Sequence, residues 1–168
     1  MEDELVLITP LNFESERLSC HELTASTLLL REHGSGSRQV VVSALEKAGL
    51  KLKSFRKVME LDSTEAIKSA VEVGLGVGFV SRWAIAKELD LGVLKTAQVG
   101  RIRVTRHFTL ISRTGPELQG VADTFRAFAR RRALLISYLS KKTNPGAQVS
   151  GDESGLSAMT ITADTRTR

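Results

Sequence analysis

Apolar and polar positions alternate most clearly in residues 60–84, ELDSTEAIKSAVEVGLGVGFVSRWA. Asp62, with Glu65 three residues later, follows a short apolar run and is typical of a helix start. Apolar residues then recur at helical spacing as far as Gly74, which suits the left-handed position after a helix. Val77–Val80 is short, β-branched and aromatic, so it predicts a strand. The stretch therefore predicts a parallel strand–helix–strand unit that is buried on both faces.

The remaining chain continues the same alternation of short apolar runs and amphipathic segments. Further strands are predicted at Leu5–Ile8, Leu28–Leu30, Phe55–Leu61 and Arg103–Ser112. Helices are predicted at Val40–Ala48 (closed by Gly49), Trp83–Leu89 (ended by Gly92) and Leu118–Tyr138. The segment Glu14–Thr27 is polar and irregular, and Leu23 is its expected apolar anchor.

This order of elements predicts an α/β fold in which a mainly parallel sheet is flanked by helices. We expect residues 1–112 to form one lobe and residues 113–142 to add a C-terminal helix. Residues 143–168 are rich in Ser, Thr, Gly, Ala and Asp and show no periodicity, so they predict a disordered tail.

Composition adds a cellular setting to this picture. The chain has 168 residues, 42% of them hydrophobic and 26% charged, as in a soluble globular protein. No apolar run reaches the length of a membrane span, and the acidic start MEDELVLITP is not typical of a signal peptide. The single cysteine, Cys20, excludes an internal disulfide, and we interpret it as a packing residue. These features predict a cytoplasmic protein without membrane contact.

The net charge of +5 is unevenly distributed. Residues 1–100 hold 12 Lys or Arg against 14 Asp or Glu, a net of −2. Residues 101–132 hold eight arginines against Glu117 and Asp123, a net of +6. A basic chain suggests nucleic acid, but few aromatic residues accompany these arginines. We interpret them as a solvated helix face and expect no specific DNA binding by this chain.

The chain offers little for catalysis or metal binding. Gly74, Gly76 and Gly78 follow a helix and precede a strand, the reverse of a dinucleotide fingerprint, so we interpret them as a helix end and a close backbone approach. There is no G-x-S-x-G motif, and the three histidines have no metal-ligand spacing. We therefore expect no enzyme activity, no metal and no cofactor.

The loop Gly34-Ser35-Gly36-Ser37 is a better candidate for a binding site because it follows a strand and opens a helix. Free backbone N–H groups at a helix start, together with two hydroxyl groups, favour an anion. Arg31 and Arg38 flank the loop, and either could supply a forked partner for carboxylate or phosphate. The alternative is that one serine is only an N-cap. Spacing alone leaves both interpretations open.

Two long segments, LLLREHGSGSRQVVVSALEKAGL and MELDSTEAIKSAVEVGLGVGFVSRWAIAKEL, closely resemble the effector-binding domain of LysR-type transcriptional regulators. The opening ELVLITP resembles that family's crossing strand between lobes, and FTLISRTGPELQGVADTFRAF resembles its return strand and closing helix. The resemblance covers roughly residues 4–135. Each motif is weak alone, but the set is specific.

The resemblance implies a periplasmic-binding-protein-like (type 2) fold of two α/β lobes, with a small-molecule effector between them. It implies a homo-oligomer whose DNA contacts come from an N-terminal winged helix-turn-helix. Against that pattern, the chain corresponds to the second, effector-binding lobe plus a helix of an incomplete first lobe, and we expect it to be a truncated form.

The resemblance also implies where the effector would bind. The family's second-lobe contacts correspond here to Thr9, Pro10, Arg31, Gly34, Ser35, Gly36, Ser37, Phe79, Val80 and Ser81. Arg31 and the helix start would suit a small anionic metabolite. Ser63 and Thr64 are interpreted as helix capping. The alternative function is a periplasmic-binding-protein-like enzyme or solute-binding protein, because fold does not fix function.

Overall fold

The computed structural model describes residues 2–108 and 120–143, the last eleven of these by their backbone alone. One compact unit comprises Asp3–Arg106, and a second resumes at His107 and contains the helix α5 (Val121–Thr143). The predicted lobe boundary after residue 112 and the predicted tail beyond residue 143 lie outside the described residues.

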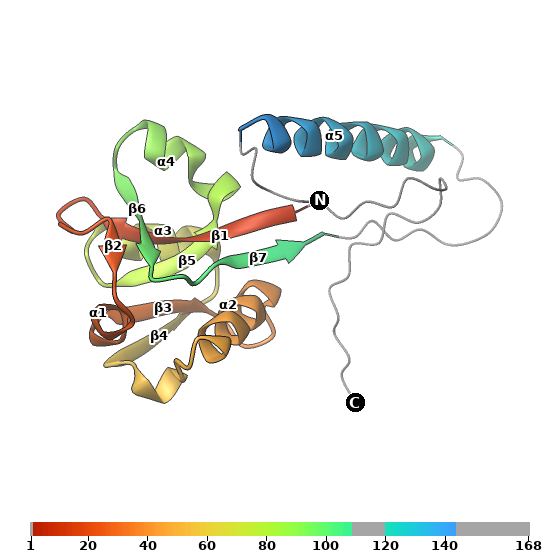
Figure 1. Ribbon diagram of the computed structural model, residues 1–168. Helices are drawn as coiled ribbons and strands as arrows, with labels where there is room; N and C mark the ends of the chain where they lie inside the picture. The colour runs from red at the N-terminus through yellow and green to blue at the C-terminus, as the bar shows by residue number, and fades with distance from the viewer. Residues whose placement is uncertain (1, 109–119, 144–168) are drawn as a thin grey trace, which may run out of the picture. The chain divides into compact units, whose positions relative to one another are not determined.

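A seven-stranded sheet forms the centre of the first unit, with the order β2-β6-β1-β5-β3-β4 and with β7 paired to β1 (Figure 1). The strands are β1 (Glu2–Pro10), β2 (Arg17–Leu18), β3 (Thr27–Arg31), β4 (Lys57–Leu61), β5 (Val77–Ser81), β6 (Leu94–Val99) and β7 (Val104–His107). β3 runs parallel to both β4 and β5, whereas β1 is antiparallel to β5 and to β6. The sheet is therefore mixed, and the predicted strand–helix–strand unit crosses over β3 rather than joining two neighbouring strands.

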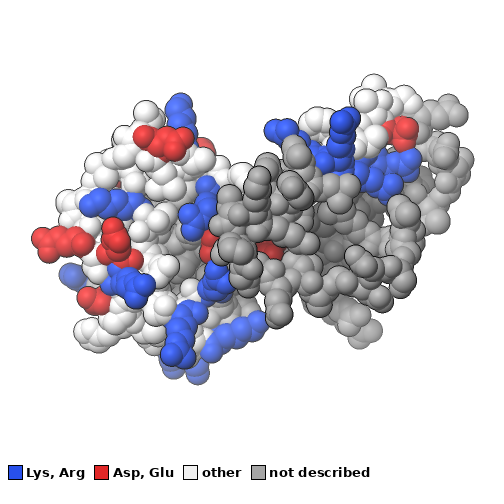
Figure 2. Space-filling model, turned by 45° about the horizontal axis from the view of Figure 1, so that its top comes forward, with Lys and Arg blue, Asp and Glu red and all other residues white. Residues whose placement is uncertain are grey.

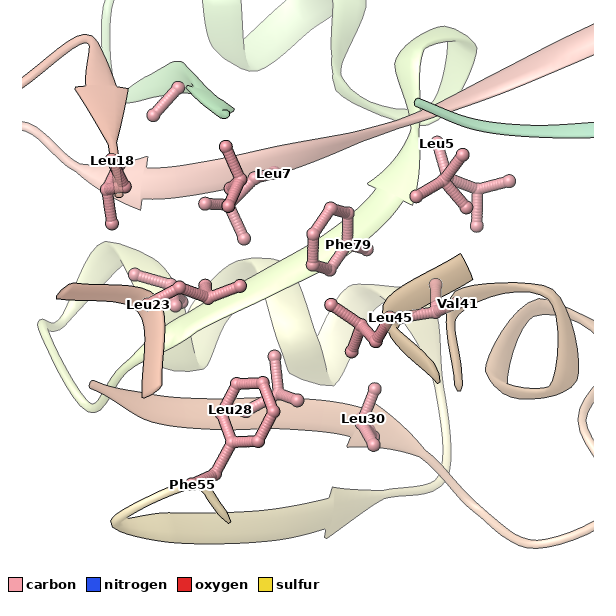
Figure 3. Packing of buried hydrophobic residues seen from close by; sticks show 14 residues of the cluster. Leu5, Leu7, Leu18, Leu23, Leu28, Leu30, Val41, Leu45, Phe55 and Phe79 are labelled. Carbon is pink, nitrogen blue, oxygen red and sulfur yellow. The ribbon is translucent and has the colours of Figure 1, made fainter. Parts of the chain in front are cut away.

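Helices cover both faces of this sheet. They are α1 (Cys20–Ala25), α2 (Gly36–Lys47), α3 (Thr64–Glu72) and α4 (Ala86–Asp90), with short 3-10 helices η1 (Leu52–Ser54) and η2 (Arg82–Ile85). Strand residues alternate between two apolar clusters because successive side chains point to opposite faces. One cluster joins α1 and α2 to Leu28 and Phe79, and Figure 3 shows these side chains converging. The other joins α3 and η2 to Leu29 and Val80.

Two glycines allow close packing where α3 and its neighbouring strands meet. A Cβ at Gly76 would lie 2.4 Å from the backbone oxygen of Thr27, and one at Gly78 would lie 2.8 Å from Cγ2 of Ile67. Gly74 has a φ of 80°, the left-handed conformation expected after a helix. The interpretation of these glycines as a helix end and a close backbone approach is confirmed.

Several element boundaries differ from the sequence prediction. The segment Glu14–Thr27, predicted as irregular, contains β2 and α1. Its predicted apolar anchor, Leu23, is fully buried, as expected. Strand β6 was missed because its exposed polar positions hide its buried residues. Ser63, not Asp62, is the N-cap of α3, and its hydroxyl accepts a hydrogen bond from the N–H of Ala66 at 3.1 Å. The predicted capping role of Ser63 is thus confirmed.

The helix α5 carries an exposed apolar stripe. Val121, Phe125 and Phe128 are 87%, 60% and 61% exposed, respectively. Arg130, Arg131 and Arg132 are exposed as well, as expected for a solvated face. No helix among residues 2–108 and 120–143 is both long and apolar enough to cross a membrane.

Candidate effector-binding site

The turn between β3 and α2 presents a helix start that its own serine leaves open. Gly34 adopts a φ of 93°, which a residue with a side chain rarely tolerates, and the Ser35 N–H donates to the Glu32 carbonyl at 3.2 Å. Ser35 is the N-cap of α2, yet its side chain makes no capping hydrogen bond. The first turn of α2 contains no acidic residue. An N-terminus of this kind favours an anion, because unpaired N–H groups and the helix dipole both point toward it.

Arg31 lies beside this turn, but an internal carboxylate holds its guanidinium. Its Nε donates to Glu32 Oε2 at 2.7 Å and its Nη2 to Glu32 Oε1 at 2.9 Å, which makes a bidentate pair. A third contact runs from Nη1 to Thr64 Oγ1 at 3.3 Å. Hydrogen bonding to Glu32 raises the pKa of Arg31, and the same bond lowers the pKa of Glu32. The Arg31 side chain therefore joins the loop after β3 to the start of α3.

Arg38 ties the turn to the neighbouring strand. Its Nη1 donates to the Arg31 carbonyl at 2.7 Å and to Glu60 Oε2 at 2.9 Å, and its side chain is only 11% exposed. Its Nη2 lies 3.1 Å from His33 Nε2. These contacts fix the loop against β4 and place a second arginine beside the helix start.

A third arginine reaches the same helix start from β7. Arg106 Nη1 donates to the Ser37 hydroxyl at 2.7 Å, and Arg106 Nε donates to Asp3 Oδ2 at 2.7 Å. The other oxygen of Asp3 accepts a hydrogen bond from the Ser81 hydroxyl at 2.7 Å. Ser81 also accepts from the N–H of Trp83 at 3.3 Å, so β1, β5, β7, α2 and η2 meet in one network.

The sheet topology explains why these residues meet. β1 is antiparallel to β5, and Leu5 pairs with Ser81, so the first residues of β1 lie at the carboxyl end of β5. The prediction missed Asp3 and Arg106, although a signal existed for each. Asp3 stands two residues before Leu5, so the alternation of a strand places it on the face of Leu5, and Arg106 stands two residues after Val104, on the same face of β7.

The structure brings together only part of the predicted set. Arg31, Gly34, Ser35, Gly36, Ser37 and Ser81 lie at the edge of the sheet where β3 and β5 end. Thr9 and Pro10 lie at the opposite edge, because they pair with Lys95 and Leu94 of β6. The structure therefore does not bring Thr9 and Pro10 together with the α2 turn, because β1 runs antiparallel to β5.

Phe79 and Val80 are also removed from the edge. Both are nearly fully buried, Phe79 in the cluster under α1 and α2 and Val80 in the cluster under α3. Their side chains shape the scaffold of β5, and Ser81 is the residue of that strand that enters the polar network. At the opposite edge, the buried Oγ1 of Thr9 has no hydrogen-bond partner among the described residues.

The charges of the candidate site balance in pairs. Its ion pairs are Arg31–Glu32, Arg38–Glu60 and Arg106–Asp3. Figure 2 shows positive and negative side chains interspersed over most of the visible face of the first unit, with several positive ones gathered at its lower border. Within the described residues, no group of three or more His, Cys, Asp or Glu could hold a metal ion. The site thus offers anion-binding groups whose charges are already compensated internally.

A family model, the LysR substrate binding domain, matches residues 1–134. The chain belongs to this family. Its fold is also that of solved family members. The CcmR regulatory domain of Synechocystis PCC6803 in complex with 2-PG has a TM-score of 0.58 and 23% identity, over 76% of this chain and 62% of the other. The bromide-bound regulatory domain of HypT from Salmonella typhimurium has a TM-score of 0.51 and 20% identity, over 62% and 48%.

A curated relative of this LysR substrate-binding domain is a probable RuBisCO transcriptional regulator of Cyanophora paradoxa. It is 39% identical over 114 residues, which are 66% of this chain and 35% of the relative. The chain therefore spans about a third of that relative's length. Family membership and the likeness of fold confirm the resemblance to LysR effector-binding domains and the α/β architecture with a sheet between helices.

Proposed function

We propose that this LysR substrate-binding domain senses a small anionic effector at the edge formed by the β3–α2 turn, Ser81 and Arg106. The effector would bind to the N-terminus of α2, and its binding would alter the activity of a transcriptional regulator. The names of the relatives support the second part, and make control of RuBisCO genes the first target to test. The 2-PG in the complex of the CcmR regulatory domain and the bromide ion bound to the HypT regulatory domain support a small or anionic ligand.

One observation carries the proposal: α2 begins at a serine whose hydroxyl makes no cap, with Arg106 placed on the second residue of the helix. An isolated helix start usually receives a side-chain oxygen. Here the carboxylate or phosphate oxygen of an effector could take that place. Arg106 and the hydroxyl groups of Ser35 and Ser37 would then supply charge-assisted hydrogen bonds.

Calorimetry with the whole chain tests the proposal directly. Bromide, sulfate, inorganic phosphate and 2-PG are titrated separately, and we expect saturable binding to at least one, with a dissociation constant on the order of millimolar. The double variant Ser35→Ala, Ser37→Ala should bind at least about tenfold more weakly, because two hydrogen bonds to a charged group are lost. Ser63→Ala is the matched control, since it changes a serine at the start of α3, and it should leave anion affinity unchanged.

Absence of saturable binding for all four anions up to tens of millimolar contradicts the proposal. Equal binding by the wild-type chain and the Ser35→Ala, Ser37→Ala variant places the anion elsewhere and also contradicts it. The two results differ in meaning, because the first rejects an anionic effector and the second rejects only this location.

We further propose that the chain self-associates through α5. Val121, Phe125 and Phe128 lie on one exposed stripe of this helix, and exposed apolar patches are typical of interfaces. Each large side chain gains about 1.5–3 kcal/mol on full burial, which favours a second copy as partner. Light scattering should show a dimer that dissociates in a Phe125→Ser, Phe128→Ser variant. A monodisperse monomer of the wild-type chain would rule this interface out.

A further inference from the structure

The three arginines at the candidate site differ in the surroundings of their carboxylate partners. Glu32 and Glu60 have side chains that are 38% and 45% exposed, whereas the side chain of Asp3 is 0% exposed. Water screens the first two carboxylates, but it cannot screen Asp3 in the same way. Asp3 is therefore the strongest internal anion facing the α2 start.

Arg106 occupies an unusual position for a cation. Its Nη1 bonds Ser37, the second residue of α2, so its guanidinium lies where the helix dipole is positive. A cation is favourable there only when an anion compensates both positive groups. Asp3 supplies that anion in the described arrangement, through its 2.7 Å contact with Arg106 Nε.

We infer that Asp3 is an internal competitor of the effector for Arg106, so that Arg106 exchanges one anion for another when the effector binds. This inference rests on the proposed function, because it concerns the regulation of the same site. An effector with a carboxylate or phosphate group at the α2 start attracts the guanidinium away from Asp3. Part of the binding free energy is then spent on separating a buried ion pair.

The same exchange of anions changes a side-chain link between two strands. Asp3 belongs to β1 and Arg106 to β7, 103 positions apart in the chain, and Asp3 also accepts the hydroxyl of Ser81 at the end of β5. When Arg106 turns to the effector, one link between the start of β1 and the end of β7 is lost. Ser81 keeps its bond to Asp3, and the sheet pairing of β1 with β7 remains, so the change is confined to the side-chain link between Asp3 and Arg106.

The test compares Asp3→Asn with Glu4→Gln in the whole chain. Asp3→Asn keeps the side-chain shape and an oxygen that can accept hydrogen bonds, but it removes the competing charge. We expect it to bind inorganic phosphate or sulfate about tenfold more tightly than the wild-type chain, because the pair need no longer be separated. Glu4→Gln removes the same charge one residue away, where Glu4 pairs with exposed Arg82 at 3.0 Å. It should change affinity less than about twofold, since screening weakens exposed pairs.

Arg106→Gln should abolish the anion response, but it leaves Asp3 buried without its cation and could impair folding. The double variant Asp3→Asn, Arg106→Gln removes both charges, and we expect it to fold and to bind anions at least tenfold more weakly than Asp3→Asn alone.

The outcomes separate this inference from the proposed function. If the wild-type chain binds an anion through Ser35 and Ser37 while Asp3→Asn binds no more tightly, the competition is refuted and the proposed function stands. If Glu4→Gln tightens binding as much as Asp3→Asn, the effect is one of overall charge and the inference is again refuted. If neither the wild-type chain nor Asp3→Asn binds phosphate or sulfate, the inference is refuted, and the proposed function is refuted with it only when bromide and 2-PG also fail to bind.

Discussion

The turns that begin α2 and α3 each place a serine at the N-cap after a parallel strand, but only α3 uses its serine as a cap. Ser63 accepts the N–H of Ala66 at 3.1 Å, whereas the Ser35 side chain makes no capping hydrogen bond. Glu65 stands in the first turn of α3, and α2 has no acidic residue there. The start of α3 is therefore satisfied by its own residues, while the start of α2 remains available to an anion.

The environments of the two helices reinforce this difference. In α3, Lys68 is buried and bonds Glu88 at 2.6 Å and Glu65 at 2.8 Å, so the charges form a closed structural cluster. At α2, Arg106 reaches the helix start from a distant strand and is held there by Asp3. Two strand–helix turns that each carry an N-cap serine thus differ, since one is capped by its own residues and the other is the turn at which we propose an anion binds.

The largest expected effect tests whether the two helices are equally anchored. Leu45 of α2 and Ile67 of α3 are both essentially fully buried, one in each apolar cluster. Leu45→Ala and Ile67→Ala should each lower the free energy of unfolding by about 2–5 kcal/mol, because each leaves a cavity. Urea denaturation measures both values. A much smaller loss for Leu45→Ala would mean that α2 is loosely held, and that its open start reflects mobility rather than a binding role.

The next effect separates two glycines of the first unit, Gly76 before β5 and Gly36 at the start of α2. Gly76→Ala should destabilise the chain by about 1–3 kcal/mol, since its Cβ would lie 2.4 Å from the Thr27 backbone oxygen. Gly36→Ala at the start of α2 meets no atom within 4 Å, so its effect on thermal unfolding should be close to zero. A large loss of stability for Gly36→Ala would contradict the open geometry of the α2 turn.

The serines give a smaller and more specific contrast. Ser63→Ala should cost about 1 kcal/mol of stability, as the loss of an N-cap usually does. Ser35→Ala should lower the stability by only about a few tenths of a kcal/mol, because no capping hydrogen bond is lost. Chemical denaturation measures the pair side by side. Equal losses would show that Ser35 does cap α2 in solution and would remove the main difference between the two turns.

The smallest effect is a dependence of stability on pH. The hydrogen bond from Lys68 lowers the pKa of Glu88, so the ionised carboxylate stabilises the fold above its ordinary pKa. That contribution, about 0.5–1 kcal/mol, should be lost as the pH falls below 4.5, the ordinary pKa, through the lowered value. Unfolding followed from pH 7 into acid should show a shallower decline for Glu88→Gln. An unchanged acid limb would mean that the Lys68–Glu88 pair contributes nothing.

Local sequence patterns determined much of the scaffold. The spacing of apolar residues predicts the strands β3 and β5 and the helices α2 and α3. Residue type predicts the left-handed conformation of Gly74 and the capping by Ser63. The glycine-rich turn between β3 and α2 follows from local residue types as well. These features depend on short-range rules, because backbone conformation and capping are decided within one or two turns of chain.

Only the tertiary structure decided how the site is assembled. The antiparallel direction of β1 places Asp3, rather than Thr9 and Pro10, beside Ser81 and the α2 start. Arg106, 69 positions after Ser37, adds a cation at the turn where the sequence suggested Arg31. Arg31 itself is held by the adjacent Glu32. Pairings across such distances depend on strand order and direction, which the pattern of one sequence does not contain.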